Sequence, residues 1–162
     1  MNFKQSLIDN DTIRLQAHAA DWREAIRIGT GMLETAGAVE PGYHAAIIRS
    51  IEKMGAYFVI APGLALPHAR PEDGVIRTAF ALVTLATPII FDGEDEPVDV
   101  LITLAGSTSD EHIEGLMEIT QTLEDESSPT GINLDRLRTC RSKNEVYRAI
   151  DNALAQAANE EG

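Results

Sequence analysis

Two apolar segments near the middle of the chain limit its fold more than any other feature. Residues 75–86 and 98–105 contain the runs TAFALVTLA and VDVLITLA, which are apolar along both faces of an extended chain. Strands of this kind are buried on both sides, so the sheet that contains them needs a covering layer on each face. The two segments therefore predict central strands in a sheet that lies between helices.

Helical patterns flank these segments and supply the covering layers. The clearest pattern opens with Asp21 and Glu24, which form a capping box, and its apolar residues recur at helical spacing as far as Ala36. Residues 107–110, Ser-Thr-Ser-Asp, predict the start of a later helix. The predicted helices cover residues 22–36, 43–54, 109–123 and 142–154.

Shorter runs of β-forming residues complete the predicted sheet. Residues 57–60 and 64–66 are short strand candidates, and residues 13–17 alternate between apolar and polar as in a half-buried strand. Helices precede and follow the strands, and the connections are too irregular for a purely parallel sheet. We therefore expect an α/β fold, a three-layer sandwich whose mixed β-sheet has helices on both faces, in a single domain of residues 1–162.

The charge of the chain argues against nucleic acid and anionic membranes as partners. The 26 acidic residues outnumber the 13 basic ones, which gives a formal net charge of −13. Such a charge repels phosphate backbones and would attract a basic partner protein, although solubility alone also explains it. The N-terminus lacks the pattern of a signal peptide, and no apolar run approaches the roughly 20 residues of a membrane span. With Cys140 as its single cysteine, the protein is expected in the cytoplasm.

His68 is the first candidate for chemistry. It follows a short strand candidate and lies in the sequence Pro67-His68-Ala69-Arg70-Pro71, where two prolines restrict the backbone. Imidazole titrates near pH ~6.5, so at neutral pH one ring nitrogen has a lone pair free to attack. The residues themselves leave two interpretations open, a nucleophile on a stiff loop or a turn histidine with no chemical role.

A second group of residues could hold an anion. His112 lies in the first turn of the helix that Ser109 or Asp110 opens, where unpaired N–H groups favour a bound phosphate and the Ser109 hydroxyl adds a donor. Arg70 could neutralise phosphate charge, because a guanidinium matches phosphate geometry. The alternatives are that the serines only cap the helix, and that Arg70 forms a surface ion pair of little consequence.

The usual markers of several enzyme classes are missing. The chain has no GxxxxGK[ST] loop, GxGxxG turn, HExxH or paired CxxC motif, and no GxSxG elbow. We therefore expect no metal site and no cofactor. His18 and His44 have no suggestive neighbours, and we expect them to be structural or exposed. Cys140 has no activating pattern beyond nearby arginines, and we expect it to be inert.

The segment GLALPHARPEDGV, residues 63–75, resembles the active-site segment of the IIA proteins of the bacterial sugar phosphotransferase system, in the mannitol/fructose class. Four residues match the Gly-x-Ala-x-Pro-His core of that class: Gly63, Ala65, Pro67 and His68. The segment VLITLAGSTSDEHIEGL is similar to a second family motif, in which a histidine opens the helix after a central strand. The wider segment from Tyr43 to Val75 is most similar to the ascorbate-type branch.

The resemblance implies a phosphocarrier. In that family the residue matching His68 accepts a phosphoryl group from HPr and passes it to a cysteine of a IIB component, which phosphorylates a sugar carried by the membrane component IIC. The residue matching His112 helps to hold the group. The family arginine on the preceding helix falls at Glu52-Lys53 here, so Arg49, one helical turn earlier, and Arg70 are both candidates for the phosphate-binding cation.

Two other functions stay open at this stage. Some relatives are phosphorylated in the same way but regulate other proteins, and sequence does not separate these from transport components. A metal-dependent hydrolase could use His68 and His112 together with Asp110 or Glu111, although no metal-ligand spacing supports it.

Overall fold

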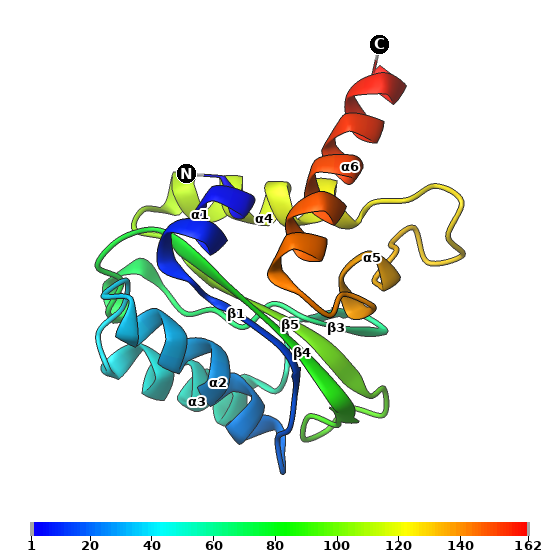
Figure 1. Ribbon diagram of the computed structural model, residues 1–162. Helices are drawn as coiled ribbons and strands as arrows, with labels where there is room; N and C mark the ends of the chain where they lie inside the picture. Colours follow the sequence, from blue (N-terminus) through cyan, green and yellow to red (C-terminus); the bar gives the residue numbers. More distant parts are fainter. Residues whose placement is uncertain (1, 162) are drawn as a thin grey trace.

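Five strands form one mixed sheet in the computed structural model, which describes residues 2–161 (Figure 1). The strands lie in the order β1-β4-β5-β3-β2. β1 is parallel to β4 and β3 is parallel to β5, whereas the β4–β5 and β2–β3 pairs are antiparallel. The strand bounds are β1 Ile13–Ala17, β2 Val59–Ala61, β3 Gly63–Ala65, β4 Ala79–Ile89 and β5 Val98–Ala105.

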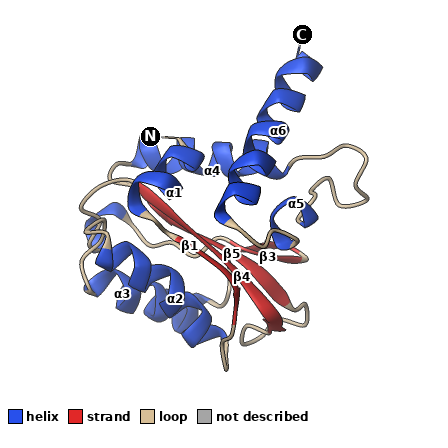
Figure 2. Ribbon diagram, viewed as in Figure 1, coloured by secondary structure: helices blue, strands red, loops and turns tan. Residues whose placement is uncertain are grey.

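Helices cover both faces of the sheet, as the central strands predicted (Figure 2). α2 and α3 pack on one face, and α1, α4, α5 and α6 pack on the other. Successive β4 residues alternate between the two cores, since Ala81 faces α2 and α3 while Phe80 and Leu82 face the opposite layer. The helix bounds are α1 Phe3–Asn10, α2 Trp22–Thr35, α3 Gly42–Met54, α4 Ser109–Leu123, α5 Asp135–Arg138 and α6 Lys143–Glu161.

Side chains at the helix starts confirm the predicted N-caps, although the carboxylate of each expected capping box bonds to the N–H one residue before the cap. The Asp21 carboxylate accepts the Glu24 N–H at 2.9 Å, and the Glu24 carboxylate accepts the Ala20 N–H at 3.2 Å. The Ser142 hydroxyl likewise accepts the Glu145 N–H at 3.2 Å. Within residues 2–161, no helix has both the length and the apolar character that crossing a membrane requires.

Several predicted boundaries were wrong, and α1 and α5 were not predicted. The first long strand begins at Ala79 rather than residue 75, because the N–H groups of Ile76 and Arg77 bond to the Ala38 carbonyl in the loop after α2. The β2 strand begins at Val59 rather than residue 57. The N-cap of α4 is Thr108, whose hydroxyl accepts a backbone N–H from the first turn.

Candidate functional site

His68 follows β3, at the end of the sheet where the parallel strands β3 and β5 both terminate. Because these strands run parallel, the chain that leaves β3 emerges beside the chain that leaves β5 toward α4. The loop is tied to β5 by the Leu104 N–H, which donates to the Pro67 carbonyl at 3.0 Å. A short 3-10 helix, Pro71–Asp73, closes the loop. The fold therefore holds His68 on a short, anchored segment.

The His68 ring is fixed in one tautomer by its own backbone. Nδ1 lies 2.7 Å from the Leu66 carbonyl oxygen, which can only accept, so Nδ1 carries the proton. Nε2 is left with its lone pair. Burial lowers the pKa of His68 below its ordinary value, although the bond to Leu66 acts in the opposite direction. The ring is therefore neutral at pH 7 and nucleophilic at Nε2.

His112 lies next to His68, as the family resemblance implied. The two ring centroids are 4.9 Å apart and the rings are inclined at 64°. Nδ1 of His112 is buried and has no hydrogen-bond partner among the described residues. Burial, and then the neighbouring His68, lower the pKa of His112. Both rings are thus neutral and lie within reach of one small group.

Gly106 allows this close approach of α4 to the sheet. A Cβ on Gly106 would lie 2.7 Å from the His112 Cα and 2.9 Å from its backbone nitrogen. Both contacts are with backbone or near-backbone atoms, which cannot rotate away. Any side chain at this position would push the first turn of α4, and His112 with it, away from β5.

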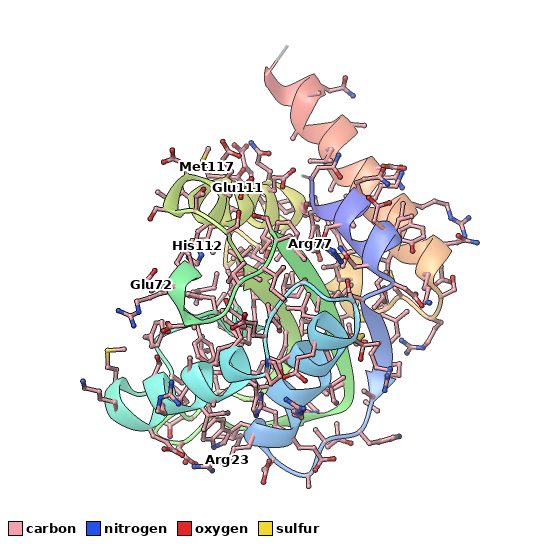
Figure 3. The ribbon with its side chains drawn as sticks, turned by 90° about the vertical axis from the view of Figure 1, so that its left-hand side faces the viewer. Arg23, Glu72, Arg77, Glu111, His112 and Met117 are labelled. Atoms are coloured by element: carbon pink, nitrogen blue, oxygen red, sulfur yellow. The ribbon has the colours of Figure 1, made fainter. Side chains whose placement is uncertain are left out.

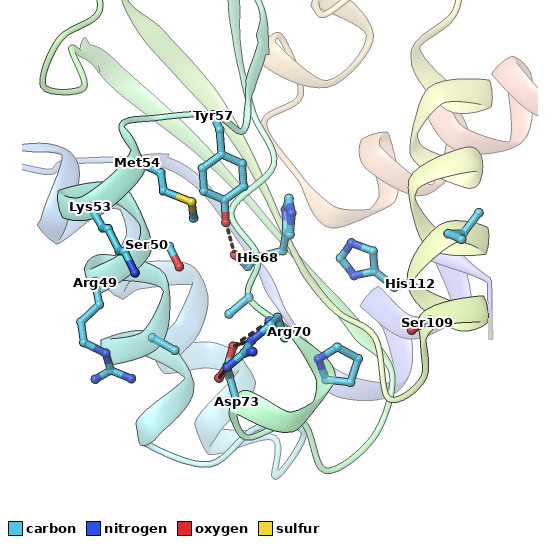
Figure 4. A pocket seen from close by; sticks show the side chains of 14 residues that line it. Arg49, Ser50, Lys53, Met54, Tyr57, His68, Arg70, Asp73, Ser109 and His112 are labelled. Atoms are coloured by element: carbon cyan, nitrogen blue, oxygen red, sulfur yellow. Dashed lines mark hydrogen bonds and ion pairs between the residues drawn. The ribbon is translucent and has the colours of Figure 1, made fainter.

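A pocket of about 830 Å³ surrounds the two histidines (Figure 4). α3 and Tyr57 form one wall, and Ser109, His112 and Ile113 of α4 form the other. The first backbone N–H groups of α4 precede its internal hydrogen-bond ladder, so this end of the helix can bind an anion. Figure 3 shows His112 between α4 and the loop that carries Glu72.

The cationic side chains that line the pocket differ in whether a carboxylate already pairs with them. Arg70 is 73% exposed, and its guanidinium makes two 3.1 Å bonds to the Asp73 carboxylate, which largely neutralises its charge. Arg49 and Lys53 line the pocket from α3, and among the side chains of residues 2–159 no carboxylate lies within 4.0 Å of either cationic group. Phosphate binding by Arg70, Arg49 and Ser109 stays a prediction, with Arg49 now the more available arginine.

The geometry gives the hydrolase alternative no support. The Glu111 carboxylate accepts hydrogen bonds from the hydroxyls of Thr78 and Ser107. Among the residues the structure describes, no three His, Cys, Asp or Glu side chains come together to hold a metal ion. His44 and Cys140 take no part in this site. The His44 ring bonds to the Thr30 hydroxyl between α2 and α3. Burial raises the pKa of the Cys140 thiol and so keeps it unreactive.

Two tyrosines at the site were missed by the sequence analysis. Tyr57 donates to the His68 carbonyl at 3.2 Å, and its ring packs edge-on against the His68 ring at 5.5 Å. Tyr43 is the first residue of the predicted helix 43–54, and its ring is buried in the core. Its hydroxyl, however, bonds to the backbone beside His68. Helical periodicity predicts which face a ring occupies but not the partner of its hydroxyl.

The lowered pKa of His68 predicts a loss of stability in mild acid. As pH falls below the ordinary histidine pKa of about 6.5, the unfolded chain binds a proton that the folded chain does not. The free energy of unfolding should then fall, by at most about 1.4 kcal/mol per pH unit for this group, down to the folded pKa. Urea unfolding between about pH 7.5 and 5 measures this. In His68→Gln the dependence of stability on pH should be weaker. Some dependence should remain, because the pKa values of His44 and His112 are also lowered. The same dependence in His68→Gln as in the wild type would contradict the prediction.

Comparison with known proteins agrees with this geometry. The family model for "Phosphoenolpyruvate-dependent sugar phosphotransferase system, EIIA 2" matches residues 6–153. The ascorbate-specific PTS system EIIA component of Salmonella typhimurium is 50% identical over 159 residues, which are 97% of this chain and 100% of that protein.

Two solved structures from Escherichia coli share the fold. The mannitol-specific cryptic enzyme IIA CmtB is 30% identical with a TM-score of 0.80, covering 94% of this chain and 99% of that one. A complex of the mannitol enzyme IIA with phosphorylated enzyme IIB is 28% identical with a TM-score of 0.73, covering 88% and 95%. These matches confirm the resemblance and the α/β sandwich. The chain belongs to the EIIA 2 family of the phosphoenolpyruvate-dependent sugar phosphotransferase system.

Proposed function

We propose that this chain is the EIIA component of an ascorbate-type phosphotransferase system. It accepts a phosphoryl group from HPr on Nε2 of His68 and passes it to a cysteine of a IIB component. The observation that carries the proposal is the fixed His68 ring, whose Nδ1 is bonded to Leu66 and whose Nε2 is left free. The 50% identity to an ascorbate-specific component supports the sugar class, and the mannitol IIA–IIB complex supports a IIB partner.

The transfer step needs positioning and charge stabilisation more than acid–base machinery. The lone pair on Nε2 attacks the phosphorus of phosphorylated HPr, and the N–P bond forms as the bond to the donor nitrogen breaks. The electron pair of the broken bond leaves with the donor ring. The proton on Nδ1 stays in its bond to the Leu66 carbonyl. His112, the first N–H groups of α4 and a pocket cation, with Arg49 the most available arginine, stabilise the phosphoryl oxygens.

The surroundings of the pocket support a protein as the partner. Three apolar side chains that line it are exposed, Met54 at 63%, Tyr57 at 44% and Ile113 at 55%. Met117, one turn further along α4, is 57% exposed. Exposed apolar side chains grouped around a reactive residue are typical of a docking surface. The net charge of −13 would steer a basic donor toward it.

Residues 1–162 act as one phosphocarrier domain in the cytoplasm, without a cofactor. This domain is linked to the membrane component IIC only indirectly, through IIB. In the regulatory alternative, the phosphorylated chain controls another protein and has no IIB acceptor.

A two-step relay tests the proposal. Radiolabelled phospho-HPr is mixed with the chain, and the labelled chain is then offered an ascorbate-type or a mannitol-type IIB component. We expect label on the chain and faster transfer to the ascorbate-type IIB, with no transfer to a IIB variant whose acceptor cysteine is serine. A chain that HPr does not label contradicts the proposal. A chain that accepts label but delivers it to neither IIB favours the regulatory alternative.

His112→Ala should slow phosphoryl transfer without moving the label from His68. The variant loses one hydrogen bond to the charged phosphoryl group, which corresponds to roughly a tenfold to a hundredfold loss in rate. Rapid-quench kinetics with phospho-HPr measures it, and His18→Ala, at an exposed position, is the matched control. If His112→Ala accepted the group as fast as the wild type, a role for His112 in holding it would be wrong.

A further inference from the structure

One buried hydroxyl joins the two segments that carry the histidines. Tyr43, on α3, is 0% exposed. Its hydroxyl accepts the Ala69 N–H at 3.0 Å and donates to the Leu104 carbonyl at 2.6 Å. Burial raises the pKa of this phenol far above its ordinary value. The hydroxyl therefore stays protonated and can donate and accept at the same time.

The two partners of this hydroxyl lie close to the reacting groups. Ala69 directly follows His68, and Leu104 is the second-to-last residue of β5. Two residues beyond Leu104, the chain passes Gly106 and enters the turn that leads to His112. A shift of the Tyr43 hydroxyl would thus change the position of the His68 loop relative to the chain that leads into α4.

We propose that Tyr43 is a positioning residue for phosphoryl transfer, whose hydroxyl sets the spacing between the His68 and His112 rings. The inference rests on the proposed function of His68. It assigns Tyr43 no contact with the phosphoryl group. The Leu104–Pro67 backbone bond holds the same loop one residue before His68, while Tyr43 holds it one residue after. Together the two ties prevent the loop from pivoting about His68.

Tyr43→Phe tests this role, because it removes the hydroxyl and keeps the buried ring. Transfer from phospho-HPr should slow roughly tenfold to a hundredfold, as expected for a misplaced reacting group. The fraction of chains finally labelled should match the wild type, since a folding defect would lower that fraction and not the rate per labelled chain. Tyr147→Phe, in the opposite helical layer, is the control and should react normally.

Two NMR measurements separate positioning from simple stability. In Tyr43→Phe the pKa of His68 should rise toward its ordinary value, because a loosened loop admits water to the ring. In the wild type, the Ala69 amide should exchange slowly with solvent. An unchanged rate and an unchanged His68 pKa in the variant would overturn the inference, as would fast exchange of Ala69 in the wild type. Failure of the wild type to accept label would instead contradict the proposed function.

Discussion

His68→Ala should be unable to accept a phosphoryl group from HPr. The variant lacks the Nε2 nitrogen that His68 presents beside His112, and loss of a nucleophile lowers transfer by roughly 10⁴-fold or more. Radiolabel from phospho-HPr should fall below detection. In the wild type the label should be labile in acid and stable in alkali, as for a phosphohistidine.

The remaining histidines provide the controls for this experiment. His18 is exposed and His44 bonds to Thr30 between two helices, so alanine at either position should leave labelling intact. Matched thermal unfolding would show that His68→Ala is folded. Residual label on a folded His68→Ala chain would place the acceptor on another residue and contradict the assignment.

Gly106→Ala should also impair transfer strongly, although position 106 has no chemical group to lose. The new Cβ would lie 2.7 Å from the His112 Cα, so the first turn of α4 must move. His112 and the helix N–H groups would move together, which we expect to lower the transfer rate on the order of 10²- to 10³-fold. Overpacking of this kind should also cost about 1–3 kcal/mol of stability.

Gly31→Ala is the matched control for this substitution. Gly31 lies in α2, and a Cβ there would have no atom within 4 Å. That variant should transfer normally and be more stable by up to about 1 kcal/mol, because alanine favours a helix. Stopped-flow or quench kinetics together with urea unfolding measures both variants. Normal transfer by Gly106→Ala would show that the position of α4 does not limit the reaction.

Strong patterns in the sequence predicted the layers and the central strands. Apolar residues on both faces of β4 and β5 require two covering layers, and the fold has them. The Asp21 capping box and the Ser-Thr-Ser-Asp stretch fixed the helix starts to within about a residue, because capping is local chemistry. The pairing of the two histidine motifs came from the family resemblance, and the parallel β3–β5 pair explains it.

Features that depend on distant contacts were not predictable in this way. α1 is eight residues long and buries only Phe3 and Leu7 as apolar side chains, too few to show a helical period. The Tyr43 hydroxyl binds backbone groups 26 and 61 positions away in the sequence. The ion pair between Arg70 and Asp73 is different, because the two residues are three positions apart and their pairing could have been predicted from the local sequence.

The position of the phosphoryl group on the ring tests the central claim most directly. NMR of the ¹⁵N-histidine-labelled wild type, phosphorylated through HPr, identifies the nitrogen that is bonded to phosphorus. The structure predicts phosphorus on Nε2 of His68, with Nδ1 still protonated and bonded to the Leu66 carbonyl. Phosphorus on Nδ1, or on any residue other than His68, would contradict it.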